Sequence, residues 1–120
     1  MALNIELKRG DVIRVSLNPV VGSEQGGERP ALIVSPDPIN RSSPVILVAS
    51  ITSKKVDRVY PFETLIEPPD GGLSLRSKVM LTHMRSIDKS RVCGHYGSLK
   101  PETMLLVEGA LKIATGLTKY

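Results

Sequence analysis

The chain has 120 residues, of which 41% are hydrophobic and only 3% aromatic, so we expect one domain over residues 1–120 with an aliphatic core. The formal net charge of +4 favours polyanionic partners, and the single cysteine, Cys93, excludes an internal disulfide and fits the reducing cytoplasm. Residues 1–9 lack the apolar stretch of a secretory signal, and the apolar runs are too short to span a bilayer, so no membrane association is expected.

Short apolar segments alternate with turn residues over the first hundred positions, a pattern typical of small β-rich domains. Residues 11–17 alternate apolar and polar side chains and predict a strand. Residues 18–30 contain two Pro and three Gly and predict a loop, whose length is typical of functional loops. Residues 31–34 predict a short buried strand, which Pro36 and Pro38 end.

Further strands are predicted in the middle of the chain. Residues 45–52 are rich in β-branched side chains and predict a central strand. Residues 62–67 predict another strand, ended by the turn residues 68–72. Residues 78–81 and 84–87 predict two shorter strands.

The last twenty residues carry a helical pattern. Pro101 suits the first position of a helix, and Gly116 suits the position after its end. Apolar side chains recur at helical spacing, at Met104, Val107, Leu111 and Ala114. The sequence therefore predicts a mainly β domain of the α+β class, with roughly five to seven short strands in a barrel-like sheet packed by a C-terminal helix.

Motifs for metal, nucleotide and acyl-transfer chemistry are missing. The chain has two His, one Cys and dispersed carboxylates without an HExxH, CxxC or Asp-rich loop, so we expect no metal site. The glycine motifs of nucleotide-binding loops and the GxSxG elbow are also missing. An enzyme with this sequence is expected to work with few groups and without a cofactor.

Arg29 stands where the glycine-rich residues 22–30 lead into a strand. Glycines let a ligand backbone approach closely, and a guanidinium presents a rigid fork of donors to a phosphate. On spacing alone, an ion pair of Arg29 with Glu24 or Glu28 in a flexible hairpin loop is the more common arrangement.

Thr52 and His83 are further candidates. Thr52 ends an apolar strand, where its hydroxyl either donates to a phosphate or simply finishes the strand. His83 is either an acid or base near neutral pH or an exposed residue of an edge strand. Lys54, Lys55 and Arg58 add a basic cluster that can equally be a solvated loop.

The segment PVVGSEQGGERPALIV resembles the signature of the MazF/PemK family of toxin endoribonucleases. That signature opens with a Gly-Asp pair, here Gly10-Asp11, and continues with Gly-Ser-Glu-Gln and then Arg-Pro before an aliphatic strand. ITSKK matches the family's strand ending in Thr, and MRSIDKSR resembles its later Arg-Ser/Thr-Ile-Asp-Lys element. The motifs occur in the family's order, and the resemblance covers about residues 8–116.

The resemblance implies an SH3-like antiparallel β-barrel with a C-terminal helix, and a homodimer that binds single-stranded RNA in a groove at its interface. It also implies metal-independent RNA cleavage at short sequences, and a cognate antitoxin whose acidic, disordered tail blocks the groove. Arg29 and Thr52 match the family's catalytic pair. The positions expected to contact RNA are Ser23, Glu24, Gln25, Ser77, Thr82 and His83.

RNA carries its own nucleophile, the 2′-OH beside the scissile phosphate. In the implied reaction this hydroxyl attacks in line and leaves a 2′,3′-cyclic phosphate and a 5′-OH end. Arg29 would bind the non-bridging oxygens, and Thr52 would add a hydrogen bond. The proton acceptor stays open, because Arg is a poor base and either Glu24 or His83 is chemically better suited. Some relatives place an acidic residue and Gln where this chain has Thr82 and His83, positions that can touch nucleobases.

Two other functions are compatible with the same fold. Toxins that poison DNA gyrase carry a critical Trp near the C-terminus, whereas this chain has no Trp. A plain SH3-like module would bind RNA without cutting it. Incubation with single-stranded RNA in EDTA separates the nuclease from both alternatives.

Overall fold

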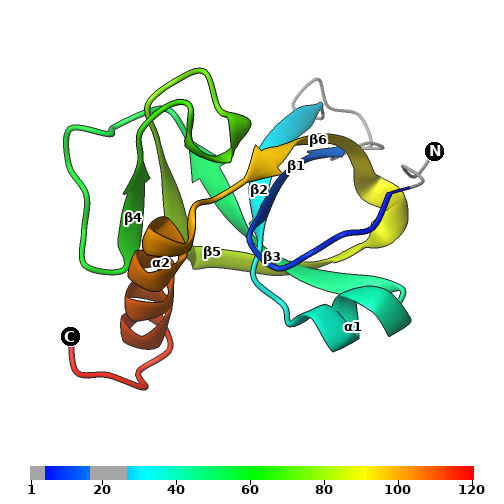
Figure 1. Cartoon of the computed structure of the whole chain (residues 1–120). Coiled ribbons are helices and arrows are strands. Elements are labelled where there is room, and N and C mark those ends of the chain that lie inside the picture. Colours follow the sequence, from blue (N-terminus) through cyan, green and yellow to red (C-terminus); the bar gives the residue numbers. More distant parts are fainter. Residues whose placement is uncertain (1–4, 17–26) are drawn as a thin grey trace, which may run out of the picture.

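The computed structural model describes residues 5–16 and 27–120. Within these ranges, six strands form one antiparallel sheet in the order β4-β5-β3-β2-β1-β6 (Figure 1). The strands are β1 (Asp11–Ser16), β2 (Glu28–Ile33), β3 (Val45–Thr52), β4 (Glu63–Ile66), β5 (Ser77–Asp88) and β6 (Val92–Ser98). The helical elements are α1 (Asp37–Ser42), the 3-10 turns η1 (Asp70–Gly72) and η2 (Lys89–Arg91), and α2 (Pro101–Ala114).

The sheet is curved but open (Figure 1). In the described residues no pairing joins β4 to β6, so the predicted mainly β fold with a C-terminal helix is confirmed, while the word barrel fits the curvature of the sheet and not its closure. α2 begins at Pro101 and packs against β4 and β5. Gly116, just beyond α2, has a φ of 79°, as the predicted helix cap requires. Within the described ranges, no helix has the length and apolar character needed to cross a membrane.

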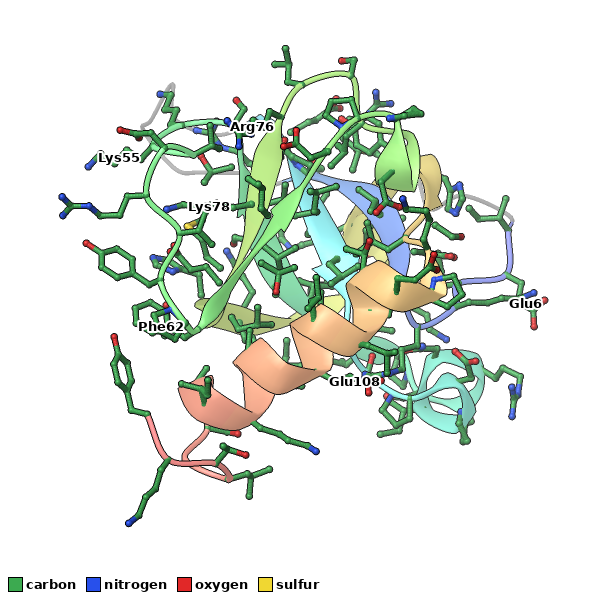
Figure 2. The ribbon with its side chains drawn as sticks, turned by 60° about the vertical axis from the view of Figure 1, so that its left-hand side comes forward. Glu6, Lys55, Phe62, Arg76, Lys78 and Glu108 are labelled. Atoms are coloured by element: carbon green, nitrogen blue, oxygen red, sulfur yellow. The ribbon has the colours of Figure 1, made fainter. Side chains whose placement is uncertain are left out.

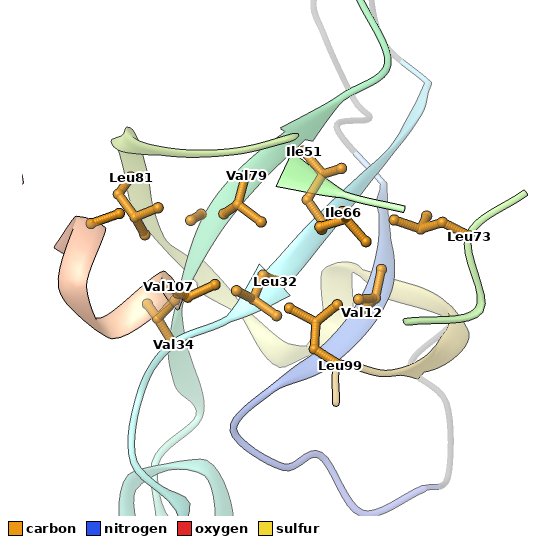
Figure 3. Close-up of a cluster of buried hydrophobic side chains, with 12 residues drawn as sticks. Val12, Leu32, Val34, Ile51, Ile66, Leu73, Val79, Leu81, Leu99 and Val107 are labelled. Carbon is orange, nitrogen blue, oxygen red and sulfur yellow. The ribbon is translucent and has the colours of Figure 1, made fainter. Parts of the chain in front are cut away.

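Two apolar clusters lie on opposite faces of the central strands, because consecutive residues of a strand point to opposite faces. Val12 and Leu32 belong to the cluster beneath α2, which Val107 of the helix completes (Figure 3). Ile13 and Ile33, the next residues in sequence, belong to the second cluster. β1 and β2 are therefore buried on both faces, which fixes the register of the strands that carry the candidate site.

The elements β2, α1 and β6 differ from the sequence-based expectation. β2 begins at Glu28, so residues 28–30, predicted as loop, pair with β1. The sequence pattern does not predict α1, in whose first turn Pro38 is tolerated because the N–H it lacks would have no helical partner there. It does not predict β6 either, because Gly94 and Gly97 interrupt the apolar alternation of that strand.

β5 is a single long strand where the sequence predicts two short ones. Its pairing with β3 changes register between two consecutive residues: Ser50 pairs with Met80, whereas Ala49 pairs with Met84. Residues 81–83 therefore have no partner on β3 and form a bulge in β5, just beyond the end of its ladder with β4. The gap between the two predicted strands and the bulge fall at the same place.

The turn that precedes β5 is held tightly against β6. Gly72 has a φ of 74°, and a Cβ at this position would lie 2.0 Å from the carbonyl oxygen of Tyr96, so only glycine fits. In the same turn, Asp70 accepts a hydrogen bond from the backbone N–H of Lys100 at 2.9 Å and another from the hydroxyl of Thr103. These contacts join the turn to β6 and to the start of α2.

Candidate active site

An open pocket of about 590 Å³ lies where β2 begins and β3 ends. It brings together four predicted site residues, Arg29, Thr52, Ser77 and His83. Its other lining residues are Pro30, Ser50, Ile51, Ser53, Lys54, Gly72, Leu73, Ser74, Leu75, Met80 and Tyr96. The predicted RNA-contacting residues Ser23, Glu24 and Gln25 lie outside the described residues.

Arg29 and Thr52 take matched positions on neighbouring strands. β2 and β3 run antiparallel, and Ala31 pairs with Ser50. The same register, if extended beyond this ladder, would bring Arg29 opposite Thr52. The recorded ladder stops at Ala31, next to Pro30, which has no N–H to donate. The exposed guanidinium and the partly buried hydroxyl both line the pocket.

The two hydroxyls of Thr52 and Ser77 differ in what they can offer a ligand. Thr52 Oγ1 accepts a hydrogen bond from the backbone N–H of Lys54 at 3.1 Å, and no described residue accepts its proton. The hydroxyl can therefore donate a hydrogen bond to a phosphate oxygen. Ser77 is buried and donates its own proton to the carbonyl oxygen of Leu75 at 2.8 Å. Ser77 therefore shapes the pocket wall and presents only oxygen lone pairs.

Glu28 does not neutralise Arg29. Its Oε1 lies 3.0 Å from Nε of Arg14 on β1. Hydrogen bonding with Cys93 and then the charge of Glu28 raise the pKa of the Arg14 guanidinium. The expected pairing of Arg29 with Glu28 is therefore wrong, and its pairing with Glu24 falls outside the described residues. Within residues 5–16 and 27–120, no carboxylate forms an ion pair with Arg29.

Thr82 and His83 are both exposed in the β5 bulge. His83 lines the pocket, whereas Thr82 does not and instead places its Oγ1 3.3 Å from Nδ1 of His83. β5 lies between β4 and β3 in the strand order, but its pairing with β4 covers only residues 77–80, so the side of β5 next to His83 is unpaired there, as the interpretation of His83 as an exposed edge residue expects. The end of the β4 ladder and the bulge in the β3 ladder together explain why His83 is exposed.

The basic connection between β3 and β4 is anchored to the sheet. Lys78 Nζ donates to Glu63 Oε1 at 2.9 Å and to the carbonyl oxygen of Arg58 at 2.8 Å. The side chains of Lys78 and Glu63 are only 6% and 7% exposed. Figure 2 shows Lys78 directed toward the connection that carries Lys55. Lys55 and Arg58 are exposed, as a solvated loop predicts, but Lys54 lines the pocket.

Tyr96 and the residues after η1 are pocket residues that the sequence does not single out. Tyr96 lies on β6, which pairs with β1, and β1 in turn pairs with β2. The curvature of the sheet, and the close approach of Gly72 to the Tyr96 carbonyl, bring these distant segments to one wall. No local pattern around residue 96 indicates this placement.

The pocket wall carries cations without carboxylates. Arg29 and Lys54 line it, and no Asp or Glu of the described ranges does. Across the same ranges, no group of three or more His, Cys, Asp or Glu side chains is arranged to hold a metal ion. The arrangement can bind a phosphate through a guanidinium, an ammonium and a hydroxyl proton.

Comparison with known proteins matches residues 8–115 to a family model described as the PemK-like, MazF-like toxin of type II toxin-antitoxin systems. The chain belongs to this family. It is 40% identical over 114 residues to endoribonuclease EndoA of Bacillus subtilis (strain 168), covering 95% of this chain and 98% of that protein. It is 37% identical over 114 residues to endoribonuclease MazF of Staphylococcus epidermidis, covering 95% of each.

A solved structure is also similar to this MazF-like chain over nearly its whole length. An endoribonuclease in complex with its cognate antitoxin from mycobacterial species superposes with a TM-score of 0.78 at 26% identity, covering 95% of this chain and 99% of that one. The family resemblance carried by the GSEQ, ITSKK and MRSIDKSR segments is thus confirmed.

Proposed function

We propose that this MazF-like chain is a sequence-specific, metal-independent endoribonuclease toxin of a type II toxin–antitoxin system, which cuts single-stranded RNA such as mRNA in the cytoplasm. The observation that carries the proposal is the pocket that Arg29 and Thr52 line together with a further cation and further hydroxyls. Membership of the family supports the activity, because the relatives EndoA and MazF are named endoribonucleases.

The chemistry follows from what RNA supplies. The 2′-OH attacks the adjacent phosphorus, so an O2′–P bond forms while the P–O5′ bond breaks, leaving a 2′,3′-cyclic phosphate and a 5′-OH end. Arg29 binds the non-bridging oxygens and stabilises the negative charge that develops on them. Thr52 donates a hydrogen bond from its free hydroxyl to the same phosphate. Holding the phosphate between the two groups also orients the attacking hydroxyl.

The pocket favours single-stranded RNA, because in-line attack requires a backbone that can be splayed, which a duplex resists. Tyr96 is the one aromatic side chain of the described lining, so base recognition relies mainly on polar groups. We assign RNA contacts to Ser23, Glu24, Gln25, Ser77, Thr82 and His83.

A cognate antitoxin is the second partner that we propose. A mycobacterial relative is an endoribonuclease solved with its cognate antitoxin. An acidic, intrinsically disordered tail suits a pocket lined by Arg29 and Lys54, because its carboxylates compete with RNA phosphates for these cations.

We further propose that the chain acts as a homodimer. Leu105 and Leu106 on α2 are 68% and 65% exposed as whole residues and border an apolar hollow between α2 and β4. Adjacent exposed leucines typically mark an interaction surface, and a second copy of the chain would cover them.

Incubation of the purified protein with a long single-stranded RNA in EDTA, followed by sequencing of the fragment ends, tests the proposed function. The expected result is cleavage at one repeated short motif, with 2′,3′-cyclic phosphate and 5′-OH ends. Intact RNA would overturn the proposal, and gyrase supercoiling and RNA-binding assays would then separate the two other functions compatible with the fold.

The variant Arg29→Ala tests the assignment of the pocket. We expect cleavage to fall about 100- to 1000-fold, because the charge that develops on the phosphate loses its principal donor. Arg85→Ala is the matched control, since it removes an exposed arginine of β5 that does not line the pocket. Equal cleavage rates for the two variants would show that Arg29 is not part of the active site.

A further inference from the structure

The proposed cleavage needs a group that accepts the proton of the 2′-OH. Arg29 and Lys54 have no acceptor atom while charged, and serine and threonine hydroxyls are weak bases. In the described lining of the pocket, the remaining groups with exchangeable protons are the phenol of Tyr96 and the imidazole of His83. Imidazole is the side chain suited to accept a proton between about pH 5 and 8.

The bulge is what gives His83 access to the pocket. β5 pairs with β4 only at residues 77–80, and residues 81–83 also leave its ladder with β3. Leu81 remains buried and donates its N–H to the carbonyl oxygen of Phe62 at 3.2 Å, which anchors one end of the bulge. Thr82 and His83 are exposed. Bulges of this kind redirect side chains and occur often beside active sites.

Thr82 contacts the His83 ring. Thr82 Oγ1 lies 3.3 Å from Nδ1 of His83. In the tautomer with its proton on Nδ1, this nitrogen donates to Thr82 and Nε2 keeps a lone pair for the substrate. The charged or titratable groups that share the pocket are Arg29 from β2, Lys54 after β3 and Tyr96 from β6.

We propose that His83 is the general base of this reaction and that Thr82 positions it, an inference that rests on the proposed RNA cleavage. Nε2 of His83 takes the proton of the 2′-OH as the O2′–P bond forms. The P–O5′ bond breaks, and O5′ takes a proton from water in the open pocket. The imidazolium then returns its proton to the solvent, so the cycle closes without a metal or redox partner.

Single-turnover cleavage of an RNA oligonucleotide that contains the mapped cut sequence, measured from about pH 5 to 9, tests the role of His83. We expect His83→Gln to lower the rate about 100-fold or more and to abolish the rise of rate with pH that a neutral imidazole produces. Its affinity for the same oligonucleotide with a 2′-deoxy nucleotide at the cut position falls far less than its cleavage rate. His95→Gln is the matched control, since His95 pairs with Asp11 and does not line the pocket.

Two rescues separate a chemical role from a structural one. Added imidazole is expected to restore part of the cleavage by His83→Gly. Thr82→Val is expected to lower the single-turnover rate about tenfold, and Thr82→Ser to retain the wild-type rate, because the serine hydroxyl can still orient Nδ1.

The inference is overturned if His83→Gln keeps the wild-type rate or pH profile, or if weaker binding of the deoxy oligonucleotide accounts for its whole loss of rate. These outcomes presuppose an active wild-type protein. A wild-type protein that leaves all RNA intact contradicts instead the proposed endoribonuclease function.

Discussion

The polar side chains of the pocket make fewer hydrogen bonds and ion pairs than those of the polar clusters that stabilise the fold. Asp11 accepts hydrogen bonds from Ser98 Oγ at 2.7 Å and from the Lys8 N–H at 3.0 Å, and it also contacts His95. In the described part of the pocket, Arg29 has no ion pair and the proton of Thr52 has no acceptor. Carboxylates with hydrogen-bond partners stabilise the fold, while the donors of the pocket remain available to a ligand.

The contrast is sharpest across the β3–β5 ladder, where Thr52 and Lys78 are paired residues. The ammonium of Lys78 is bound to Glu63 and to the Arg58 carbonyl, whereas the hydroxyl of Thr52 opens to the pocket. Of these two paired residues, Lys78 thus contributes to stability and Thr52 to ligand binding. Substitution of each is therefore expected to affect a different measurement.

The largest effect on stability is expected from Lys78→Met. It leaves the carboxylate of Glu63 buried without its cation, which lowers the free energy of unfolding by about 3 kcal/mol or more. Urea denaturation measures this loss. The double variant Lys78→Met, Glu63→Leu is the control, because replacement of both charges by apolar groups is expected to restore most of the stability. A single variant as stable as the wild type would contradict a structural role for this pair.

Thr52→Val is expected to act on cleavage alone. It removes the free hydroxyl but keeps a β-branched side chain, so single-turnover cleavage falls about 100-fold while the melting temperature is unchanged. Thr52→Ser keeps the hydroxyl and is expected to retain most of the activity. A lower melting temperature with an unchanged cleavage rate would contradict the role of Thr52 in cleavage and show that it contributes to stability instead.

The smallest effect is expected at Asp37. The backbone N–H of Arg9, which donates to Asp37 Oδ1 at 2.7 Å, and the side chain of Asn40 lower the pKa of this carboxyl. Its contribution to stability is therefore present above the unfolded-state pKa of about 4 and is lost as the pH falls through the lower folded-state pKa. Denaturation at a series of acidic pH values should show a shallower decline for Asp37→Asn than for the exposed-residue control Asp57→Asn. Equal declines would contradict this contribution.

Local patterns predicted the elements whose cause is local. The β-branched run at residues 45–52 has the bounds of β3, and Pro101 begins α2 as its fixed φ favours. The sequence did not predict β6, because its glycines interrupt the alternation of apolar and polar residues. The pairing of β6 with β1 also depends on residues far away in sequence. The sequence did not predict the Lys78–Glu63 ion pair either, because only the pairing of β4 with β5 brings the two side chains together.

The candidate site was predictable to the extent that it lies in family motifs. The ERPALIV and ITSKK segments indicated Arg29 and Thr52, and both residues line the same pocket. The sequence did not indicate Tyr96, whose place in the pocket depends on the curvature of the sheet. It indicated Thr82 and His83 as candidate RNA contacts and left them in a gap between two strands, but it did not predict the bulge, because a bulge depends on the pairing of two strands and has no pattern within one of them.

The β5 bulge also separates variation from stability. An exchange of side chains in an interior strand usually disturbs the core or the ladder, but Thr82 and His83 are exposed and unpaired with β3. Substitutions at these two positions are therefore expected to leave the sheet and its core intact, so that a loss of cleavage reports on chemistry and not on unfolding. Libraries randomised at residues 82 and 83 alone should remain folded, and rapid cleavage should persist only in the members that keep His83.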